Sequence, residues 1–260
     1  MKYLLSVLLF TVVINSLLAQ STATIKIFDA PHARQAVCAD SSFFYVIDNA
    51  TIIKRDRKEG LEIKSWSDDR LHHLNSGFIK DSLLYCAHSN YPQIPMHSSI
   101  EIWNTHTLEH VGTHSFGIEN GSCTWVVEKD NFYYVMFAHY NNEGKKQKNR
   151  DVSWTQLIKY DKEWRRVAGW VLPKDLIDKV SPYSISGGIL LEDGRLLCTH
   201  HHFKELYILS FPEMGSELIY EATISTEIRG QGIYLDTDGY LWGIDKKERK
   251  VIQTLLPQLL

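Results

Sequence analysis

The sequence predicts an all-β protein, a five-bladed β-propeller closed by an N-terminal strand that completes the last blade. Short runs rich in Val, Ile, Tyr, Phe and Trp recur between turns of Asp, Gly, Asn and Lys, among them FFYVID, SSIEIW and ELYILSF. Such runs indicate a sandwich, a barrel or a propeller. They form five units whose starts lie roughly forty to sixty residues apart, near the length of a four-stranded blade. A β-sandwich is the alternative fold, but it would not explain the fivefold register.

Residues 1–19 are predicted to be a secretory signal peptide. Lys2 precedes a long apolar run, and Ala19 supplies a small residue at a plausible cleavage point. The run is short for a membrane span, and no cysteine follows it to carry a lipid anchor. We therefore expect residues 20–260 to form one exported domain, secreted or periplasmic, monomeric and free of the membrane once the signal is removed.

Each of the five units is expected to open with a strand of small residues, because the innermost strands of a propeller crowd around its axis. These openings are RQAV from Arg34, NSGF from Asn75, SCTW from Ser122, SISGG from Ser184 and GQGI from Gly230. An aromatic-rich second strand follows in each unit, but the last unit lacks a fourth strand. The unassigned strand Thr24–Phe28 would complete it and remove an exposed edge. Only Pro173–Pro182 has helical character, as two short turns.

Composition excludes several classes of protein. The net charge of -3, without a basic stripe interleaved with aromatic residues, argues against a nucleic-acid partner. The four cysteines, which lack a CxxC pair, are too few and too widely spaced for a disulfide scaffold or a structural zinc site: Cys38, Cys86, Cys123 and Cys198. We interpret them as buried apolar residues, with one disulfide as the alternative. No Ser-His-Asp order, phosphate loop or dinucleotide fingerprint is present.

The ends of the five second strands carry a narrow set of side chains. In chain order they are Asp48, His88, His139, His200 and Asp245. In a propeller, the second strand ends on the face where the first begins, so we expect all five around the mouth of the central channel. We predict His88, His139 and His200, with His73, to be catalytic. The other histidines are interpreted as loop or outer-strand residues, namely His97, His106, His110, His114, His201 and His202.

Imidazole and carboxylate are common ligands of zinc, iron and manganese. The trio His88, His139 and His200 therefore predicts one divalent metal, zinc, manganese or iron, that would activate water or polarise a carbonyl. Without a metal, the same histidines would act as general acids or bases. The alternative for each histidine is a structural, hydrogen-bonded role, and for Asp48 and Asp245 a role in capping turns or joining blades.

Residues that lead into the first strands are predicted to bind a small-molecule substrate at the same mouth. Arg34 and Arg229 would hold a carboxylate or phosphate through two-pronged hydrogen bonds. The remaining predicted contacts are His32, Gln35, Asn75, Ser76, Ser186 and Gln231. Hydrogen bonding between blades is the alternative for HARQ and HHLNSG.

The motifs HARQAV, HLNSG, CAHSNYPQIPMHSSIEIW, GSCTWV, FAHY, SISGG and GQGIYLDTDGYLWGID resemble a family of small exported bacterial β-propeller proteins that carry cycloisomerase-like labels. The resemblance covers nearly the whole chain after residue 19 and implies the fold more than the reaction. More distantly, the sequence is similar to lactonase and lyase propellers, but it lacks a recognisable set of their acidic and amide calcium ligands. A propeller scaffold does not itself specify function.

These observations favour an exported enzyme that acts on a small polar substrate, anionic or sugar-derived, by hydrolysis, elimination or isomerisation. The alternative is a non-catalytic propeller that binds a carbohydrate or a peptide, and an interaction scaffold is a third class. A lectin-like propeller should repeat near-identical sites in every blade, whereas the mouth residues here differ from blade to blade. This difference favours one asymmetric site, and so an enzyme.

Overall fold

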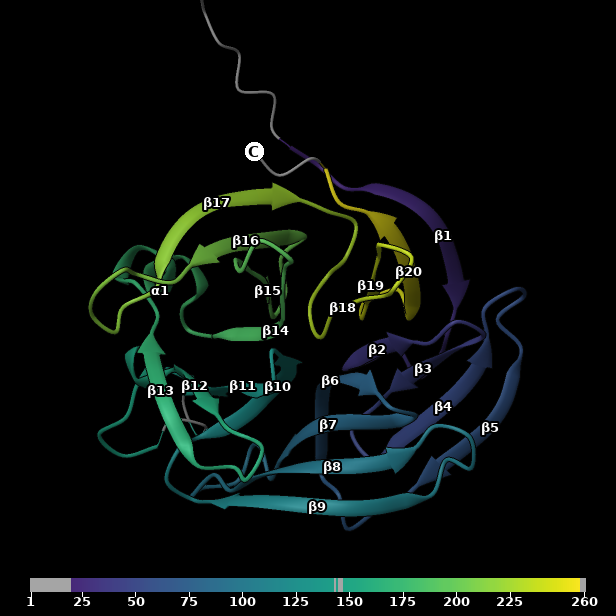
Figure 1. Cartoon of the computed structure of the whole chain (residues 1–260), viewed down its shortest axis with the longest axis horizontal. Coiled ribbons are helices and arrows are strands. Elements are labelled where there is room, and N and C mark those ends of the chain that lie inside the picture. Colours follow the sequence, from purple (N-terminus) through teal and green to yellow (C-terminus); the bar gives the residue numbers. More distant parts are fainter. Residues whose placement is uncertain (1–19, 143, 145–146, 258–260) are drawn as a thin grey trace, which may run out of the picture.

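A computed structural model describes residues 20–142, 144 and 147–257 of the chain. The predicted signal peptide, residues 1–19, lies outside these described residues. Five four-stranded antiparallel sheets surround a central axis (Figure 1). The prediction of an all-β, five-bladed propeller is therefore confirmed.

Each blade consists of four strands, and in the first four blades the strands follow sequence order from the axis outward (Figure 1). Blade 1 contains β2 (Ala36–Ala39), β3 (Phe43–Ile47), β4 (Thr51–Asp56) and β5 (Glu62–Ser67). Blade 2 contains β6 (His73–Lys80), β7 (Leu83–Ser89), β8 (Ser98–Asn104) and β9 (His110–Gly117). Blade 3 contains β10 (Ser122–Lys129), β11 (Phe132–Ala138), β12 (Gln156–Tyr160) and β13 (Arg166–Val171). Blade 4 contains β14 (Ile185–Leu190), β15 (Leu196–His200), β16 (Glu205–Ser210) and β17 (Ile219–Ser225). Blade 5 contains β18 (Tyr234–Leu235), β19 (Tyr240–Asp245), β20 (Lys250–Leu255) and β1 (Ala23–Asp29).

The ring is closed by β1, which pairs antiparallel with β20 as the outer strand of blade 5 (Figure 1). Phe28 is opposite Val251 in this pairing and points inward, where its ring lies 4.8 Å from Phe44 and 6.1 Å from Trp242. Gly60, at a backbone φ of +77°, lets the β4–β5 turn approach that ring, since a Cβ there would be 2.6 Å from Phe28 Cδ1. The predicted closure by Thr24–Phe28 is confirmed.

The inner strands meet so closely that side chains barely fit between them. A Cβ on Gly232 would lie 2.5 Å from the Cβ of Ala36 in blade 1 and 2.6 Å from that of Ser76 in blade 2. A Cβ on Gly187 would lie 2.3 Å from the carbonyl oxygen of Gln231. Real Cβ contacts are essentially never this short, so the small residues that open each unit are required by the fold.

Apolar side chains fill the spaces between blades. The largest fully buried side chains include Trp103, Trp125 and Trp242. All four cysteines are buried free thiols, and burial raises their pKa values, as expected for interior apolar residues.

Regular structure outside the blades is limited to a 3₁₀ turn, η1 (Val152–Trp154), and one helix, α1 (Lys174–Val180), among the residues described. The helix joins blades 3 and 4 and buries Leu176 and Val180. With seven residues it makes about two helical turns, as expected for this segment.

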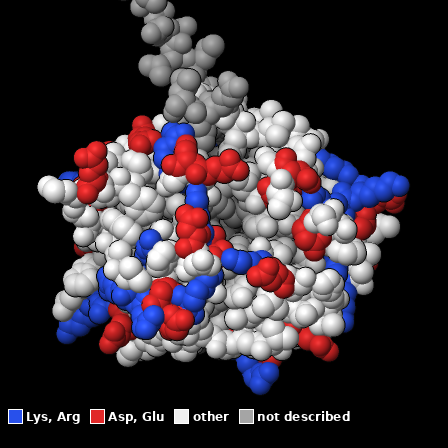
Figure 2. All heavy atoms as spheres, viewed as in Figure 1, with Lys and Arg blue, Asp and Glu red and all other residues white. Residues whose placement is uncertain are grey.

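Two properties of the surface bear on partners. No helix in the described part of the chain is long and apolar enough to span a membrane. On the face drawn in Figure 2, acidic and basic side chains are interspersed, in keeping with the net charge of -3. This face has no broad region of one sign.

Replacing Phe28 with Ala tests the closure. The change removes a ring from the contact between β1 and blades 5 and 1, and should lower the free energy of unfolding by about 3–5 kcal/mol. Ile27→Ala is the matched control on the same strand, because Ile27 is 50% exposed; its cost should be about 1 kcal/mol or less. Urea denaturation measures both, and equal losses would show that β1 does not close the core.

Candidate functional site

The five strand-end residues lie where the sequence predicted, at the ends of β3, β7, β11, β15 and β19. All of them are buried, with exposed fractions of 6% or less for Asp48, His88, His139, His200 and Asp245. Their side chains bond to loops or neighbouring strands rather than to one another. Over the residues described, no three or more His, Cys, Asp or Glu side chains form a group that could hold a metal ion.

Two of the three histidines fix loops on the mouth face. His200 Nδ1 accepts hydrogen bonds from the backbone N–H groups of His202 (2.9 Å) and Phe203 (3.0 Å), and its Nε2 donates to the Val180 carbonyl at 3.2 Å. His139 Nε2 donates to the Asn120 carbonyl at 3.1 Å. Desolvation by burial lowers both pKa values, that of His139 to about 4.

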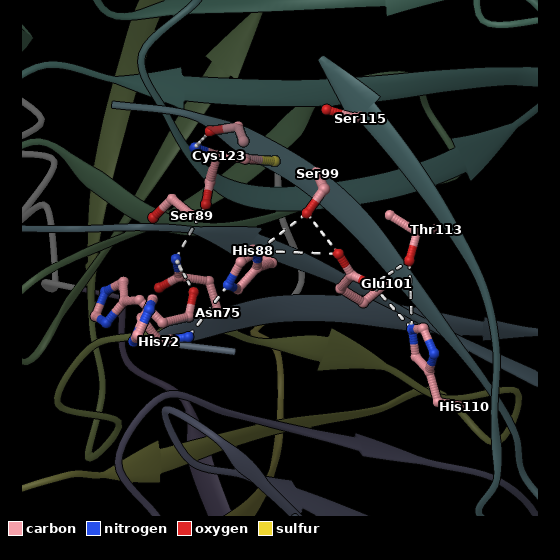
Figure 3. Close-up of polar contacts among 12 residues, drawn as sticks. His72, Asn75, His88, Ser89, Ser99, Glu101, His110, Thr113, Ser115 and Cys123 are labelled. Carbon is pink, nitrogen blue, oxygen red and sulfur yellow. Dashed lines mark hydrogen bonds and ion pairs between the residues drawn. The ribbon is translucent and has the colours of Figure 1, made fainter. Parts of the chain in front are cut away.

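His88 starts a hydrogen-bond chain that runs from β7 through β8 to β9, the outer strand of blade 2 (Figure 3). Its Nε2 accepts from the His72 N–H at 3.3 Å, so its Nδ1 donates to Ser99 Oγ at 2.9 Å. Ser99 donates in turn to Glu101 Oε1 at 2.6 Å, and Glu101 Oε2 accepts from His110 Nε2 at 2.8 Å. Burial lowers the pKa of His88 to about 4.

Both ring nitrogens of His88 and of His200 are therefore used within the protein. The trio does not fit a shared metal ion in this arrangement, and the metal centre stays an untested prediction. The structural alternative, hydrogen bonding of each histidine, describes the observed contacts.

The residues that reach the openings of the first strands lie one position later, because successive side chains of a strand point to opposite faces. They are Asn49, Ser89, Tyr140, His201 and Lys246. Asn49 Oδ1 accepts from Gln35 Nε2 at 2.5 Å, and Ser89 Oγ lies 2.9 Å from Ser122 Oγ. Of these five residues, His201 and Lys246 have side chains that could act as an acid or a base or bind an anion.

A hydrogen-bonded network joins blades 1, 4 and 5 at the mouth. Gln231 Nε2 donates to Gln35 Oε1 at 2.9 Å, and His201 Nδ1 donates to Gln231 Oε1 at 2.7 Å. Ser186 Oγ lies 3.3 Å from the same His201 nitrogen. The structure thus brings together the predicted Gln35, Gln231 and Ser186 around a histidine that sequence reasoning left out.

The other predicted contacts lie elsewhere on this face. Asn75 Nδ2 donates to the Cys123 carbonyl at 3.0 Å and so joins blades 2 and 3, whereas the buried Ser76 lies against Gly232, ahead of blade 5. The ring of His73 lies 4.9 Å from that of Tyr91, which is 5.1 Å from that of Tyr140. These three rings form what we call the aromatic row.

His32 Nδ1 lies 3.5 Å from Asp48 Oδ2, and the residue lines a separate pocket of about 190 Å³ with Arg55 and Glu62. It does not line the cavity that holds the predicted arginines.

That cavity, which we call the basic cavity, has a volume of about 430 Å³. Its lining residues are Arg34, His202, Arg229, Lys246, Lys247 and Arg249. The lining holds five formal positive charges and no acidic side chain. It comes from the residues that precede β2 and β18, from the β15–β16 loop and from the β19–β20 turn. Of its members, sequence reasoning found Arg34 and Arg229.

Strand-end carboxylates orient both arginines. Asp48 Oδ2 lies 3.4 Å from Arg34 Nε, and Asp245 Oδ2 lies 3.6 Å from Arg229 Nε. The two pairs occupy equivalent places in adjacent blades. Each aspartate also caps its turn, the first of the two alternatives predicted for it: Asp48 Oδ1 accepts from the Asn49 N–H at 2.8 Å, and Asp245 Oδ1 accepts from the Lys247 N–H at 3.0 Å.

The positive charges of the cavity act on its titratable groups. Burial, with Lys246 and Arg229 among the contributing charges, lowers the pKa of His202 to about 4. Burial and the neighbouring Arg249 lower the pKa of Lys246 to about 8. Both shifts mean that a further positive charge is disfavoured here, so a bound anion would be favoured.

A second pocket at the outer edge of blades 1 and 2 was not anticipated. It has a volume of about 360 Å³ and is lined in part by Trp66, Arg70, Glu101 and His110. The one signal for it in the sequence was an acidic residue inside the apolar strand SSIEIW.

Comparisons with known proteins bear on the fold. No family model matches the chain, and no curated protein matches it. Hydrazine synthase from Kuenenia stuttgartiensis is similar at 12% identity and a TM-score of 0.50, over 90% of this chain and 71% of that one. A chain of the Mitotic Checkpoint Complex is similar at 11% identity and a TM-score of 0.48, over 98% of both chains. U3-55K is similar at 11% identity and a TM-score of 0.49, over 85% of this chain and 80% of that one. Likenesses at such identities concern the fold alone, and they give no support to the cycloisomerase-like labels or to a bacterial origin.

Stability should depend on pH through the buried histidines. In the unfolded chain a histidine titrates near 6.5, whereas His88 and His139 titrate near 4 when folded. Between these values the unfolded state binds more protons, so stability is fully present above about pH 6.5 and falls as the pH drops toward 4. His88→Gln should flatten this slope, and His106→Gln, at an exposed position, should not. Melting temperatures from pH 7.5 to 4.5 test this, and equal slopes in wild type and His88→Gln would contradict it.

Proposed function

We propose that the protein is an enzyme that binds a small anionic substrate, a carboxylate or a phosphate ester, in the basic cavity. One observation carries the proposal: five cationic side chains and a histidine line one cavity, and no acidic side chain lines it. Charges of one sign that converge in a concave site raise the local concentration of ligands of the opposite sign. The overall charge of -3 makes this local excess a property of the site and not of the whole chain.

The two arginines are suited to hold the anionic group. A guanidinium offers parallel N–H donors that match the two oxygens of a carboxylate or phosphate. Because Asp48 and Asp245 already contact Nε of Arg34 and Arg229, the side chains are partly ordered before a ligand arrives. Less side-chain entropy is then lost on binding.

His202 supports turnover as well as binding. It lines the same cavity, and its lowered pKa leaves the imidazole neutral near pH 7 and able to accept a proton. An anion bound beside it would raise that pKa toward the range in which histidine exchanges protons most effectively. Hydrolysis, elimination and isomerisation each need such a group.

The aromatic row favours a second candidate, a non-catalytic site for a carbohydrate or peptide. Aromatic rings commonly pack against the apolar faces of such ligands. The rings of His73, Tyr91 and Tyr140 lie next to one another on the mouth side of the propeller. A ligand of this kind would bind without dependence on the arginines. Export, which depends on residues 1–19, stays a prediction under both candidates.

Anion binding is tested by calorimetry and by thermal shift with phosphate, citrate and glucuronate, and with glucose as the uncharged comparison. The anions should raise the melting temperature, and their affinity should fall with added salt. The double variant Arg34→Gln, Arg229→Gln should bind more weakly by roughly tenfold to a hundredfold per lost charged contact.

Arg70→Gln is the matched control, because Arg70 is a highly exposed arginine outside the basic cavity. An equal loss in this control, or wild-type protein that no anion stabilises, would refute the proposal. Salt-independent binding of glucose that survives the double substitution would favour the carbohydrate candidate.

A further inference from the structure

Lys246 is placed differently from the other lysines of the chain. It is the first residue after β19 and lines the basic cavity with Arg34, Arg229 and Arg249. Within the described residues, no ion pair or hydrogen bond is found for its ammonium group. The adjacent carboxylate, Asp245, lies 3.6 Å from Arg229 and 3.9 Å from Lys204 instead.

The charged and titratable groups around Lys246 are mostly cationic. Arg249 and Lys247 belong to its own turn, Arg34 and Arg229 come from the residues preceding β2 and β18, and His201 and His202 come from the loop after β15. The acidic residues nearest in sequence are Asp245, which already faces two cations, and the exposed Glu248 of the same turn, which does not line the cavity. Such surroundings favour the neutral amine over the ammonium.

The pKa of Lys246 sets the fraction of its side chain that is a neutral amine. Burial, followed by Arg249, brings the pKa of Lys246 to about 8. At pH 7.5, roughly a quarter of this side chain is then unprotonated, against about a thousandth for an ordinary lysine. A desolvated lysine beside other cations is a known route to a nucleophilic amine.

We propose that Lys246 forms a Schiff base with the carbonyl carbon of an anionic aldehyde or 2-oxo acid held by Arg34 and Arg229. This inference deepens the proposed function and rests on it. It names the substrate class, an anion that carries a carbonyl beside its charged group. It also places a covalent intermediate in the reaction within the basic cavity.

The step balances without any oxidant or reductant. The Nζ lone pair attacks the carbonyl carbon, and the carbonyl π electrons move to oxygen, which takes up a proton. Loss of that oxygen as water forms the C=N bond, and the two hydrogens of the water correspond to the two lost by the amine. His202, on the same cavity wall, is placed to carry these protons. The imine nitrogen then takes up one proton from solvent, and the resulting iminium withdraws electrons from the neighbouring carbon, as elimination or isomerisation there requires.

Reductive trapping tests the inference on the full-length protein. Incubation with pyruvate and sodium cyanoborohydride, followed by peptide mass spectrometry, should place the reduced adduct on Lys246. Labelling should exceed that of Lys247 and of the exposed Lys174 by about tenfold or more, because burial and Arg249 lower the pKa of Lys246 and the arginines of the cavity hold the carboxylate of pyruvate. Acetone, which has the carbonyl but no charge, should show a smaller preference for Lys246 than pyruvate does, because the arginines do not hold it, and excess phosphate should suppress labelling by pyruvate.

Lys246→Arg keeps the positive charge and should abolish the preferred adduct, whereas Lys174→Arg, at an exposed position outside the basic cavity, should keep it. If Lys246→Arg fails to fold, the variant Arg34→Gln, Arg229→Gln serves instead and should reduce labelling of Lys246 but not of Lys174. Anion-induced stabilisation without an adduct on Lys246 would overturn the Schiff base and leave the proposed anion site standing. Preferred labelling of Lys246 that neither phosphate nor the arginine variants change would support the amine nucleophile and overturn its anion clamp.

Discussion

The approach of five inner strands at the axis is the constraint on which the rest of the structure depends. Where Gly232 faces Ala36 and Ser76, there is no room for a larger side chain. The strands adapt with irregular register at equivalent places in β6, β10 and β14, which contain Asn75 and Ser76, Thr124 and Ser186. Bulges of this kind re-aim side chains. Polar groups consequently gather at the mouth, where Gln35, Gln231 and His201 bond across three blades.

The residue at the end of the second strand has different contacts in different blades, and the charge of its side chain decides which contacts it makes. At the end of the second strand, blades 2, 3 and 4 carry a histidine that is neutral when buried and bonds backbone or hydroxyl groups nearby. Blades 1 and 5 carry an aspartate there, and each aspartate holds an arginine. The basic cavity lies beside the two blades with aspartates, whose carboxylates attract its two predicted arginines. A nearly fivefold scaffold thus acquires a site on one side only.

The sequence was sufficient to predict the blade count, the closure by β1 and the face that carries the polar groups, since strand patterning and small residues encode them. It was also sufficient to find Arg34 and Arg229. His201 and Lys246 were missed because each directly follows the last residue of its strand, where strand patterning does not show which of two successive residues faces the mouth. Lys247 and Arg249 were missed because their convergence with Arg34 exists only after the ring closes. Glu101 lies in an outer strand and had no repeated counterpart to draw notice.

Closure by β1 also sets an order of events during synthesis. β1 and Arg34 are made early, whereas β18, β19 and β20 are made last, and all must meet to complete blade 5 and the cavity beside it. Until then β1 has no partner strand and is a free edge, the kind of edge that pairs wrongly with other chains. In a growing chain the basic cavity is therefore incomplete, and under the proposed function its ligand would bind only the finished ring. Ligand present during maturation would favour the closed form over open ones.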